Sequence, residues 1–221
     1  MTASPRGAPA PSGDTASPPG DGPRPPEDGP SAPEDDARLI ERSRSHPDAF
    51  AGLYDRHAPS IHRYAARRLG DHAADDVVAE TFLAAFRRRG RYDLARPDAR
   101  PWLYGIAANL IGKHRRSETR MLQALARTGA DPVTDAIDRA DARVSAAAVS
   151  RRLAGALADL PARDRDVLLL VAWADLSYQQ VAEALSIPVG TVRSRLNRAR
   201  RKVREALGGS DPTNVHEGTD A

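Results

Sequence analysis

Apolar residues recur at helical spacing along most of this 221-residue chain, and no segment of useful length alternates with the period of two that marks a strand. Three helices are predicted in the first half, over residues 48–70, from about Asp71, and over 101–116. Pro59 predicts a bend in the first helix, and Asp71 is placed to cap the second. The pattern therefore predicts an all-α fold.

Residues 176–207 predict two further helices joined by a tight turn. Ser177 is placed to cap the first, and Pro188 suits the start of the second. In the second helix an inward face is marked by Val192, Leu196, Ala199 and Val203, which recur at steps of four, three and four. The opposite face carries Ser194, Asn197, Arg198 and Arg201, and Arg193 and Arg204 flank it. A short supporting helix followed by an exposed polar and basic face is the helix-turn-helix arrangement that fits a DNA major groove.

Composition divides the chain into two small helical domains joined by a flexible linker, with a tail at each end. The expected boundaries are a disordered, acidic, proline-rich tail over 1–36, a helical domain over 37–117, a linker over 118–148, a helix-turn-helix domain over 149–208 and an acidic tail over 209–221. Ten of the eighteen prolines fall in 1–36, where almost no large apolar side chain is present to offset the entropy of ordering.

The net charge of +3 hides a strong segregation of charge. Residues 1–36 carry a net charge of −5 and residues 209–221 carry −3, so the body between them carries +11. A basic body between acidic tails favours a polyanionic partner. The chain has no cysteine, and its longest apolar run, Val167–Ala174, is far shorter than the roughly 20 residues of a membrane span. We therefore expect a cytoplasmic protein.

No arrangement of residues predicts catalysis. The six histidines are scattered without a His-Glu-x-x-His pair, and no glycine-rich phosphate loop follows a strand. Asp75, Asp76 and Glu80 lie in the first turns of a helix, where stabilisation by the helix dipole or a contact surface is favoured over a metal site. We expect no catalytic residue, metal, cofactor or small-molecule substrate.

A second nucleic-acid signal lies in the helix over 101–116. It combines Trp102 with Asn109, Lys113 and Arg116, and the loop before it contains Tyr92. Aromatic rings beside positive charge suit single-stranded DNA, whose unstacked bases and phosphates need both. Trp102 itself falls on the apolar stripe, which favours a place in the core.

Taken together, these motifs resemble an extracytoplasmic-function (ECF) sigma factor, the compact bacterial type with regions 2 and 4 only. The resemblance rests on DDVVAETFLAAFRR at 75–88, PWLYGIAANLIGKHRR at 101–116 and the helix-turn-helix segment within 157–203. It implies that region 2 binds the polymerase clamp and helps to melt the −10 promoter element, and that region 4 reads the −35 element. The implied partners are core RNA polymerase, through its clamp and flap, promoter DNA and an anti-sigma factor.

The resemblance also implies roles for individual residues. Polymerase contact falls to Asp75, Asp76, Glu80 and Thr81. The −10 contacts fall to Tyr92, Asn109, Lys113 and Arg116. The −35 contacts fall to Arg193, Ser194, Asn197, Arg198 and Arg201, of which Arg201 is expected to meet phosphate.

The chain departs from the family's pattern at two informative positions. Gly105 stands where a basic residue is common, and Asn197 stands where a bulky or aromatic residue is common. The alternative interpretation is a stand-alone helix-turn-helix regulator whose first half dimerises or senses a ligand. That alternative explains 176–207 but not the aromatic and basic helix at 101–116. A third interpretation, an enzyme with a DNA-binding appendage, lacks an assembled site.

Overall fold

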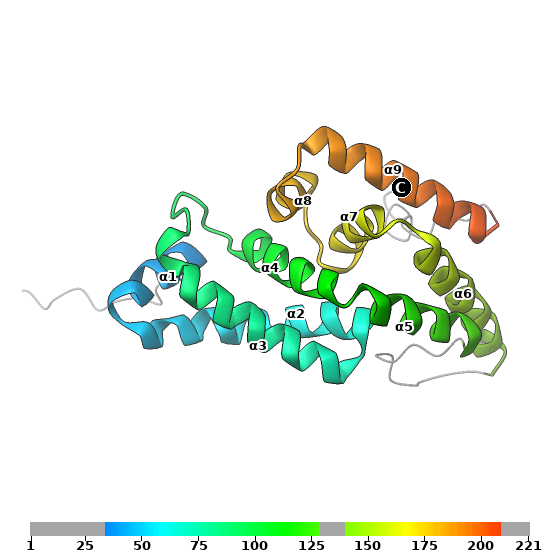
Figure 1. Ribbon diagram of the computed structural model, residues 1–221, viewed down its shortest axis with the longest axis horizontal. Helices are drawn as coiled ribbons and strands as arrows, with labels where there is room; N and C mark the ends of the chain where they lie inside the picture. The colour runs from blue at the N-terminus through cyan, green and yellow to red at the C-terminus, as the bar shows by residue number, and fades with distance from the viewer. Residues whose placement is uncertain (1–33, 129–139, 209–221) are drawn as a thin grey trace, which may run out of the picture. The chain divides into compact units, whose positions relative to one another are not determined.

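Helices make up the regular structure of residues 34–128 and 140–208, the ranges that the computed structural model describes (Figure 1). In chain order they are α1 (Asp36–Ser45), α2 (Ala51–Leu69), α3 (Asp71–Arg88), α4 (Arg100–Lys113), α5 (Arg115–Thr128), α6 (Ala140–Asp159), α7 (Ala162–Trp173), α8 (Tyr178–Leu185) and α9 (Val189–Ala206). Two short 3-10 helices, Pro47–Phe50 and Arg89–Arg91, precede α2 and follow α3. Neither range contains a strand, so the all-α prediction is confirmed.

The first five helices form what we call the N-terminal module, in which α2 and α3 pack against each other and α4 packs on both. Its core is built from large side chains that solvent does not reach, among them Ile40, Leu53, Ile61, Tyr64, Leu103 and Ile111. Gly70 joins α2 to α3 with a φ of 86°, a conformation that glycine adopts without strain.

One local prediction for this module needs revision. Pro59 lies inside α2, which runs without interruption from Ala51 to Leu69, so the bend predicted there stays a prediction. Asp71 does not cap α3, because it is the first residue of that helix and Gly70 takes the capping position without a side-chain hydrogen bond.

Helices α6 to α9 form the C-terminal module. Its core contains Val167, Leu170, Val181 and Val192, all fully buried. Helices α7 and α8 both pack on α9, and α6 packs on α9 as well. The prediction of a helix-turn-helix at 176–207 is confirmed by α8, the turn and α9.

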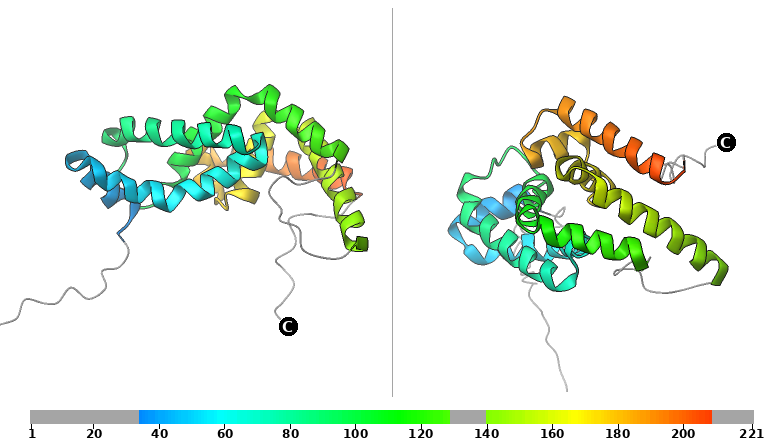
Figure 2. Two further views of the ribbon diagram at one scale, coloured as in Figure 1. Left: turned by 90° about the horizontal axis from the view of Figure 1, so that it is seen from below. Right: turned by 45° about the vertical axis from the view of Figure 1, so that its right-hand side comes forward.

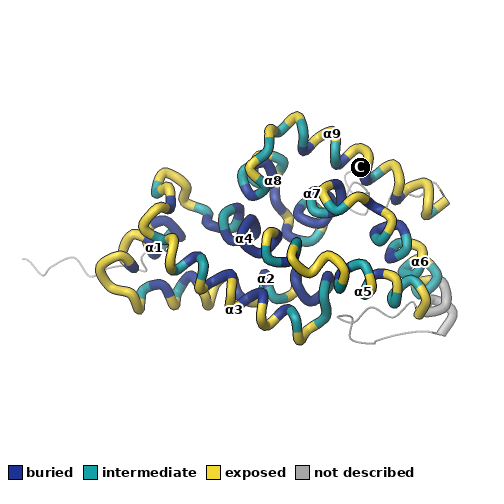
Figure 3. Tube along the Cα trace, in the orientation of Figure 1, coloured by how far each residue is buried: buried dark blue, intermediate teal, exposed yellow. Residues whose placement is uncertain are grey.

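Helix α4 is buried on nearly every side. Its buried residues are Pro101, Leu103, Tyr104, Gly105, Ile106, Ala107, Ala108 and Ile111 (Figure 3). A helix that is apolar all round requires neighbours on all sides. Helices α2 and α3 supply them on one side, and α8 of the C-terminal module supplies them on another.

The expected domain boundaries shift at two places. Asp36, assigned to the disordered tail, begins α1 and is buried. The expected linker over 118–148 is helical as far as Thr128 and again from Ala140, and Leu122 within it is buried. Helices α5 and α6 then lie side by side (Figures 1 and 2). The predicted tail over 1–33, the middle of the linker and the tail over 209–221 lie outside the described residues.

None of the helices within the described ranges is both long enough and apolar enough to cross a membrane.

Candidate nucleic-acid interface

The helix-turn-helix is fixed at its start by a reciprocal cap. The Ser177 hydroxyl accepts a hydrogen bond from the Gln180 backbone N–H at 3.2 Å, and the Gln180 side-chain oxygen accepts one from the Ser177 N–H at 2.9 Å. Ser186 ends α8 in the left-handed conformation, with a φ of 51°, and Pro188 immediately precedes α9. The predicted cap at Ser177 is confirmed, and it satisfies backbone N–H groups at the start of α8.

Helix α9 presents one apolar and one polar face. The predicted inward residues Val192, Leu196, Ala199 and Val203 are all buried. Arg193, Ser194, Asn197 and Arg201 are exposed on the other side. Arg193 and Asn197 line a shallow hollow with Arg200 and Arg204, which gathers three guanidinium groups and one amide at the surface of the helix.

Arg198 lies differently from its neighbours on α9. Its guanidinium donates two hydrogen bonds of 3.2 Å to the carboxylate of Asp164 at the start of α7. Hydrogen bonding and charge from Asp164 raise the pKa of Arg198. The side chain is half exposed, but its Nε and Nη2 atoms are engaged, so a base contact through that edge requires that the pair with Asp164 opens.

A second basic hollow lies between α3 and α4. Asn109 and Lys113, two of the predicted −10 residues, line it together with Arg87 and Arg88 of α3. All four side chains are exposed. The sequence interpretation missed the two arginines, although the run RRRGR at 87–91 signals a concentration of positive charge. Glu80 also lines the hollow, so three cations and one carboxylate surround the amide. The excess of positive charge suits a strand whose phosphates and bases are both accessible.

Tyr92 does not join this hollow. Its side chain is buried, its hydroxyl donates to the Arg96 carbonyl at 2.8 Å, and its ring lies 4.9 Å from that of Trp102. Burial raises the pKa of Tyr92. Tyr92 therefore fixes the loop before α4 and is not exposed for stacking on a base. Arg116 is exposed on α5 and does not line the hollow.

Asp36 holds the loop before α4 in place through hydrogen bonds, a role that the sequence did not predict. Its carboxylate accepts hydrogen bonds from the Arg56 guanidinium at 2.6 Å and the Ala99 N–H at 2.9 Å, and it lies 2.8 Å from the His57 imidazole. Burial alone raises the pKa of Asp36, but the hydrogen bonds from His57 and Ala99 outweigh it and lower the pKa overall. The start of α4 is thus tied to α1 and α2.

The exposed surface of α2 and α3 mixes acidic and apolar groups. Asp75, Asp76 and Glu80 are exposed. Tyr54 and Leu83 expose nearly half of their side chains beside them, a signal that the sequence interpretation did not use. Thr81 is fully buried and therefore lies outside this surface. Within the described residues, no group of three His, Asp or Glu side chains is arranged to hold a metal ion.

Comparison with known proteins matches both modules separately. A family model for Sigma-70 region 2 matches residues 53–121, and one for Sigma-70, region 4 matches residues 150–203. The chain is 37% identical over 173 residues to the ECF RNA polymerase sigma factor SigL of Mycobacterium tuberculosis, which covers 77% of this chain and 96% of SigL. It is 31% identical over 179 residues to the ECF RNA polymerase sigma factor SigW of Bacillus subtilis, covering 77% of this chain and 95% of SigW.

Among solved structures, CnrH in complex with the cytosolic domain of CnrY aligns with a TM-score of 0.57 and 28% identity, covering 79% of this chain and 98% of CnrH. The first family range runs from α2 into α5, and the second runs from α6 through most of α9. Each matched range therefore falls within one module.

Proposed function

Because this chain belongs to the ECF RNA polymerase sigma factors, alternative sigma factors that act in transcription initiation, we propose that its two basic hollows divide promoter recognition between them. The observation that carries the proposal is their placement on different modules. One hollow lies between α3 and α4, within the region 2 match, and the other lies on α9, within the region 4 match.

On α9, Arg193, Ser194 and Asn197 face the −35 duplex and read base edges in the major groove. An arginine bound to guanine through two hydrogen bonds, or an asparagine bound to adenine, contributes about 1–3 kcal/mol of discrimination against the wrong base. Arg201 binds phosphate, because it is exposed on the same helix beyond the base-reading residues. Arg198 joins the base-reading set through its Nε edge only after it leaves Asp164.

Between α3 and α4, Asn109 binds an unstacked base of the −10 strand while Arg87, Arg88 and Lys113 hold its phosphates. Extruding a base costs a few kcal/mol, which stacking and hydrogen bonds in a fitted site offset. The network around Asp36 and Tyr92 keeps the start of α4 in place while the strand binds.

The mixed surface of α2 and α3 is the proposed contact with the polymerase clamp. Its acidic residues are Asp75, Asp76 and Glu80, and its apolar residues are Tyr54 and Leu83. Exposed apolar side chains beside charge are typical of a surface that a partner covers. The C-terminal module would then lie toward the polymerase flap.

The partner of CnrH in its solved structure is the cytosolic domain of CnrY. By analogy, we extend the proposal to an anti-sigma protein that binds this chain and keeps it from core polymerase. The cytoplasmic site of action and the absence of an enzymatic activity belong to the same proposal.

A binding experiment separates this function from that of a stand-alone regulator. Target promoters are first identified by sequencing the DNA that co-purifies with the chain and polymerase. The purified chain is then mixed with this promoter DNA, in the presence and in the absence of core enzyme. We expect tight, sequence-specific binding only with core enzyme. Tight binding by the free chain as a dimer, with no retention of core enzyme, would refute the proposal.

A further inference from the structure

The pair between Arg198 and Asp164 leaves part of the Arg198 guanidinium available. A guanidinium carries five N–H donors in a fixed plane. The two bonds to Asp164 use Nε and Nη2, at 3.2 Å each, so the donors on Nη1 and one donor on Nη2 take no part in them. One N–H of Nη1 and the remaining N–H of Nη2 form a second fork. Such a fork matches the O6 and N7 acceptors of guanine in the major groove.

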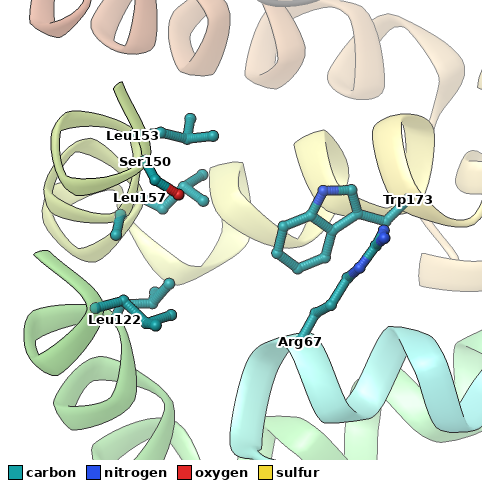
Figure 4. A pocket seen from close by; sticks show the side chains of 8 residues that line it. Arg67, Leu122, Ser150, Leu153, Leu157 and Trp173 are labelled. Atoms are coloured by element: carbon teal, nitrogen blue, oxygen red, sulfur yellow. The ribbon is translucent and has the colours of Figure 1, made fainter. Parts of the chain in front are cut away.

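Asp164 is the fixed member of the pair. It is buried in the first turn of α7, where the helix dipole favours a negative charge. The next residue, Arg165, is buried too, and its guanidinium donates to the Leu157 carbonyl of α6 at 2.9 Å. Trp173, the last residue of α7, packs on the core and lines an apolar cavity with Leu153 and Leu157 (Figure 4). Both ends of α7 are therefore anchored, so the carboxylate keeps its place.

Arg198 stands among the residues proposed to contact the −35 duplex. At about 100° per residue, Arg198 and Asn197 lie on opposite flanks of the polar face of α9, with Ser194 and Arg201 between them. Asn197 lines the shallow hollow on its flank, and Arg198 does not. The Arg198 side chain is 53% exposed, whereas that of Asp164 is 9% exposed. The accessible part of the pair therefore belongs to Arg198.

An arginine on such a helix has two kinds of acceptor on DNA. A guanine edge carries sequence information, and a phosphate carries none. An unrestrained arginine side chain can reach a phosphate on any sequence. The bond to Asp164 orders the side chain before DNA arrives, so less conformational entropy is lost when the second fork meets a base. A phosphate contact that needs another orientation requires the pair to break, so the pair favours base reading over phosphate binding.

We propose that Asp164 is a specificity-determining positioning residue, which holds Arg198 so that the fork of Nη1 and Nη2 binds one guanine of the −35 element. This assignment rests on the proposed function, because it states how α9 reads one of the base pairs it faces. Asp164 makes no contact with DNA itself and acts through Arg198.

Competition binding by the complex of the full chain with core enzyme tests the role of Asp164. The competitors are promoter fragments in which each −35 base pair is replaced in turn, and one fragment with a scrambled −35 element. Arg198→Ala should lose about tenfold or more of the selection at one G·C base pair. Asp164→Asn, which keeps the size of the side chain but removes its charge, should lose several-fold selection at that same base pair.

Binding to the scrambled fragment should change in the opposite direction. In Asp164→Asn the released Arg198 can bind a phosphate on any sequence, so affinity for this fragment should rise several-fold. The salt slope should steepen by about 0.9, the value for one further phosphate contact. A residue that only stabilises the fold would not raise affinity for any fragment.

Asp159→Asn is the matched control. Asp159 is exposed at the end of α6, and its substitution removes the same charge. Selection and salt slope should equal those of the starting chain. A double variant then tests whether Asp164 acts through Arg198. In the Arg198→Ala background, Asp164→Asn should change neither the selection nor the salt slope.

Undiminished selection at the Arg198 base pair in Asp164→Asn would overturn the positioning role. An equal loss of affinity on every fragment, or the same effect in the Arg198→Ala background, would overturn it too. A complex that selects −35 base pairs but does not respond to Asp164→Asn leaves the proposed function standing. A starting complex that discriminates against none of the −35 replacements would overturn the proposed function, and the role of Asp164 with it.

Discussion

Asp36 shows how a single buried carboxylate positions a DNA-reading helix from a distance. It accepts hydrogen bonds from α2 and from the Ala99 N–H just before α4. The charge is buried but has several donors, which is the condition under which a buried ion stabilises a fold. The side chain touches no proposed DNA contact, so its role is one of positioning.

Asp36→Asn should lower the free energy of unfolding at pH 7 by about 1–3 kcal/mol, because charge-assisted hydrogen bonds are weakened in a buried site. The folded pKa of Asp36 lies below its usual value, so this stabilisation is present above the unfolded pKa of about 4 and is lost as pH falls through the folded pKa. The difference in free energy of unfolding between Asp36→Asn and the starting chain should therefore become smaller in acid. Urea unfolding at pH 7 and below pH 4 measures it, with exposed Asp55→Asn as the control.

On α9, base reading and phosphate binding should separate by residue. Asn197→Ala should relax selection at one −35 base pair, costing about 1–3 kcal/mol on the preferred site only. Arg201→Ala should weaken all sequences alike and reduce the salt slope by about one. Competition binding by the complex with core enzyme, at several salt concentrations, distinguishes them. Equal losses of affinity on every sequence for both variants would contradict the assignment of Asn197 to base reading and of Arg201 to phosphate binding.

At the scale of elements, the apolar pattern predicted a helix well where one face of that helix is apolar and buried. The inward residues of α9 and the Ser177 cap follow directly from spacing and residue type. The pattern failed at α5, where alternating alanine and charge hid Leu122 and Glu118, both buried. Glu118 is buried because of Arg68, 50 residues away, and Arg165, 47 residues away. No local signal carries such a pairing.

The candidate site was predicted in part for the same reason. Asn109 and Lys113 could be named from their own helix, whereas Arg87 and Arg88 join them only because α3 packs on α4. Thr81 was assigned from the resemblance to the family and Tyr92 from the aromatic and basic pattern, and tertiary packing buries both side chains.

The cap of α8 should contribute measurably to the C-terminal module. Ser177→Ala removes the acceptor for the Gln180 N–H and should lower the free energy of unfolding by about 1 kcal/mol. Chemical denaturation monitored by circular dichroism measures the change. Ser45→Ala, at the exposed end of α1, should remain within about 0.5 kcal/mol of the starting chain. A loss at Ser45 as large as at Ser177 would argue against the cap.

The hollow between α3 and α4 should bind the −10 strand through its arginines. Arg87→Ala and Arg88→Ala should each weaken binding of a single-stranded −10 oligonucleotide by the complex with core enzyme, and reduce the salt slope by about 0.7. Arg91→Ala is the matched control, since Arg91 is exposed nearby but does not line the hollow. An equal loss at Arg91 would indicate general charge attraction without a defined site.

At the scale of the whole molecule, one chain must place two modules on two promoter elements together with core polymerase. Joining the modules raises the effective concentration of the second contact once the first is made.

The most direct test is promoter melting, followed by permanganate oxidation of unpaired thymines at the −10 element. Reactive thymines should appear only when both core enzyme and this chain are present. Asn109→Ala should reduce their reactivity while leaving protection of the −35 duplex intact, and Asn197→Ala should reduce both on the preferred promoter. Melting by core enzyme alone, or full melting with Asn109→Ala, would contradict the division of promoter recognition between the two modules.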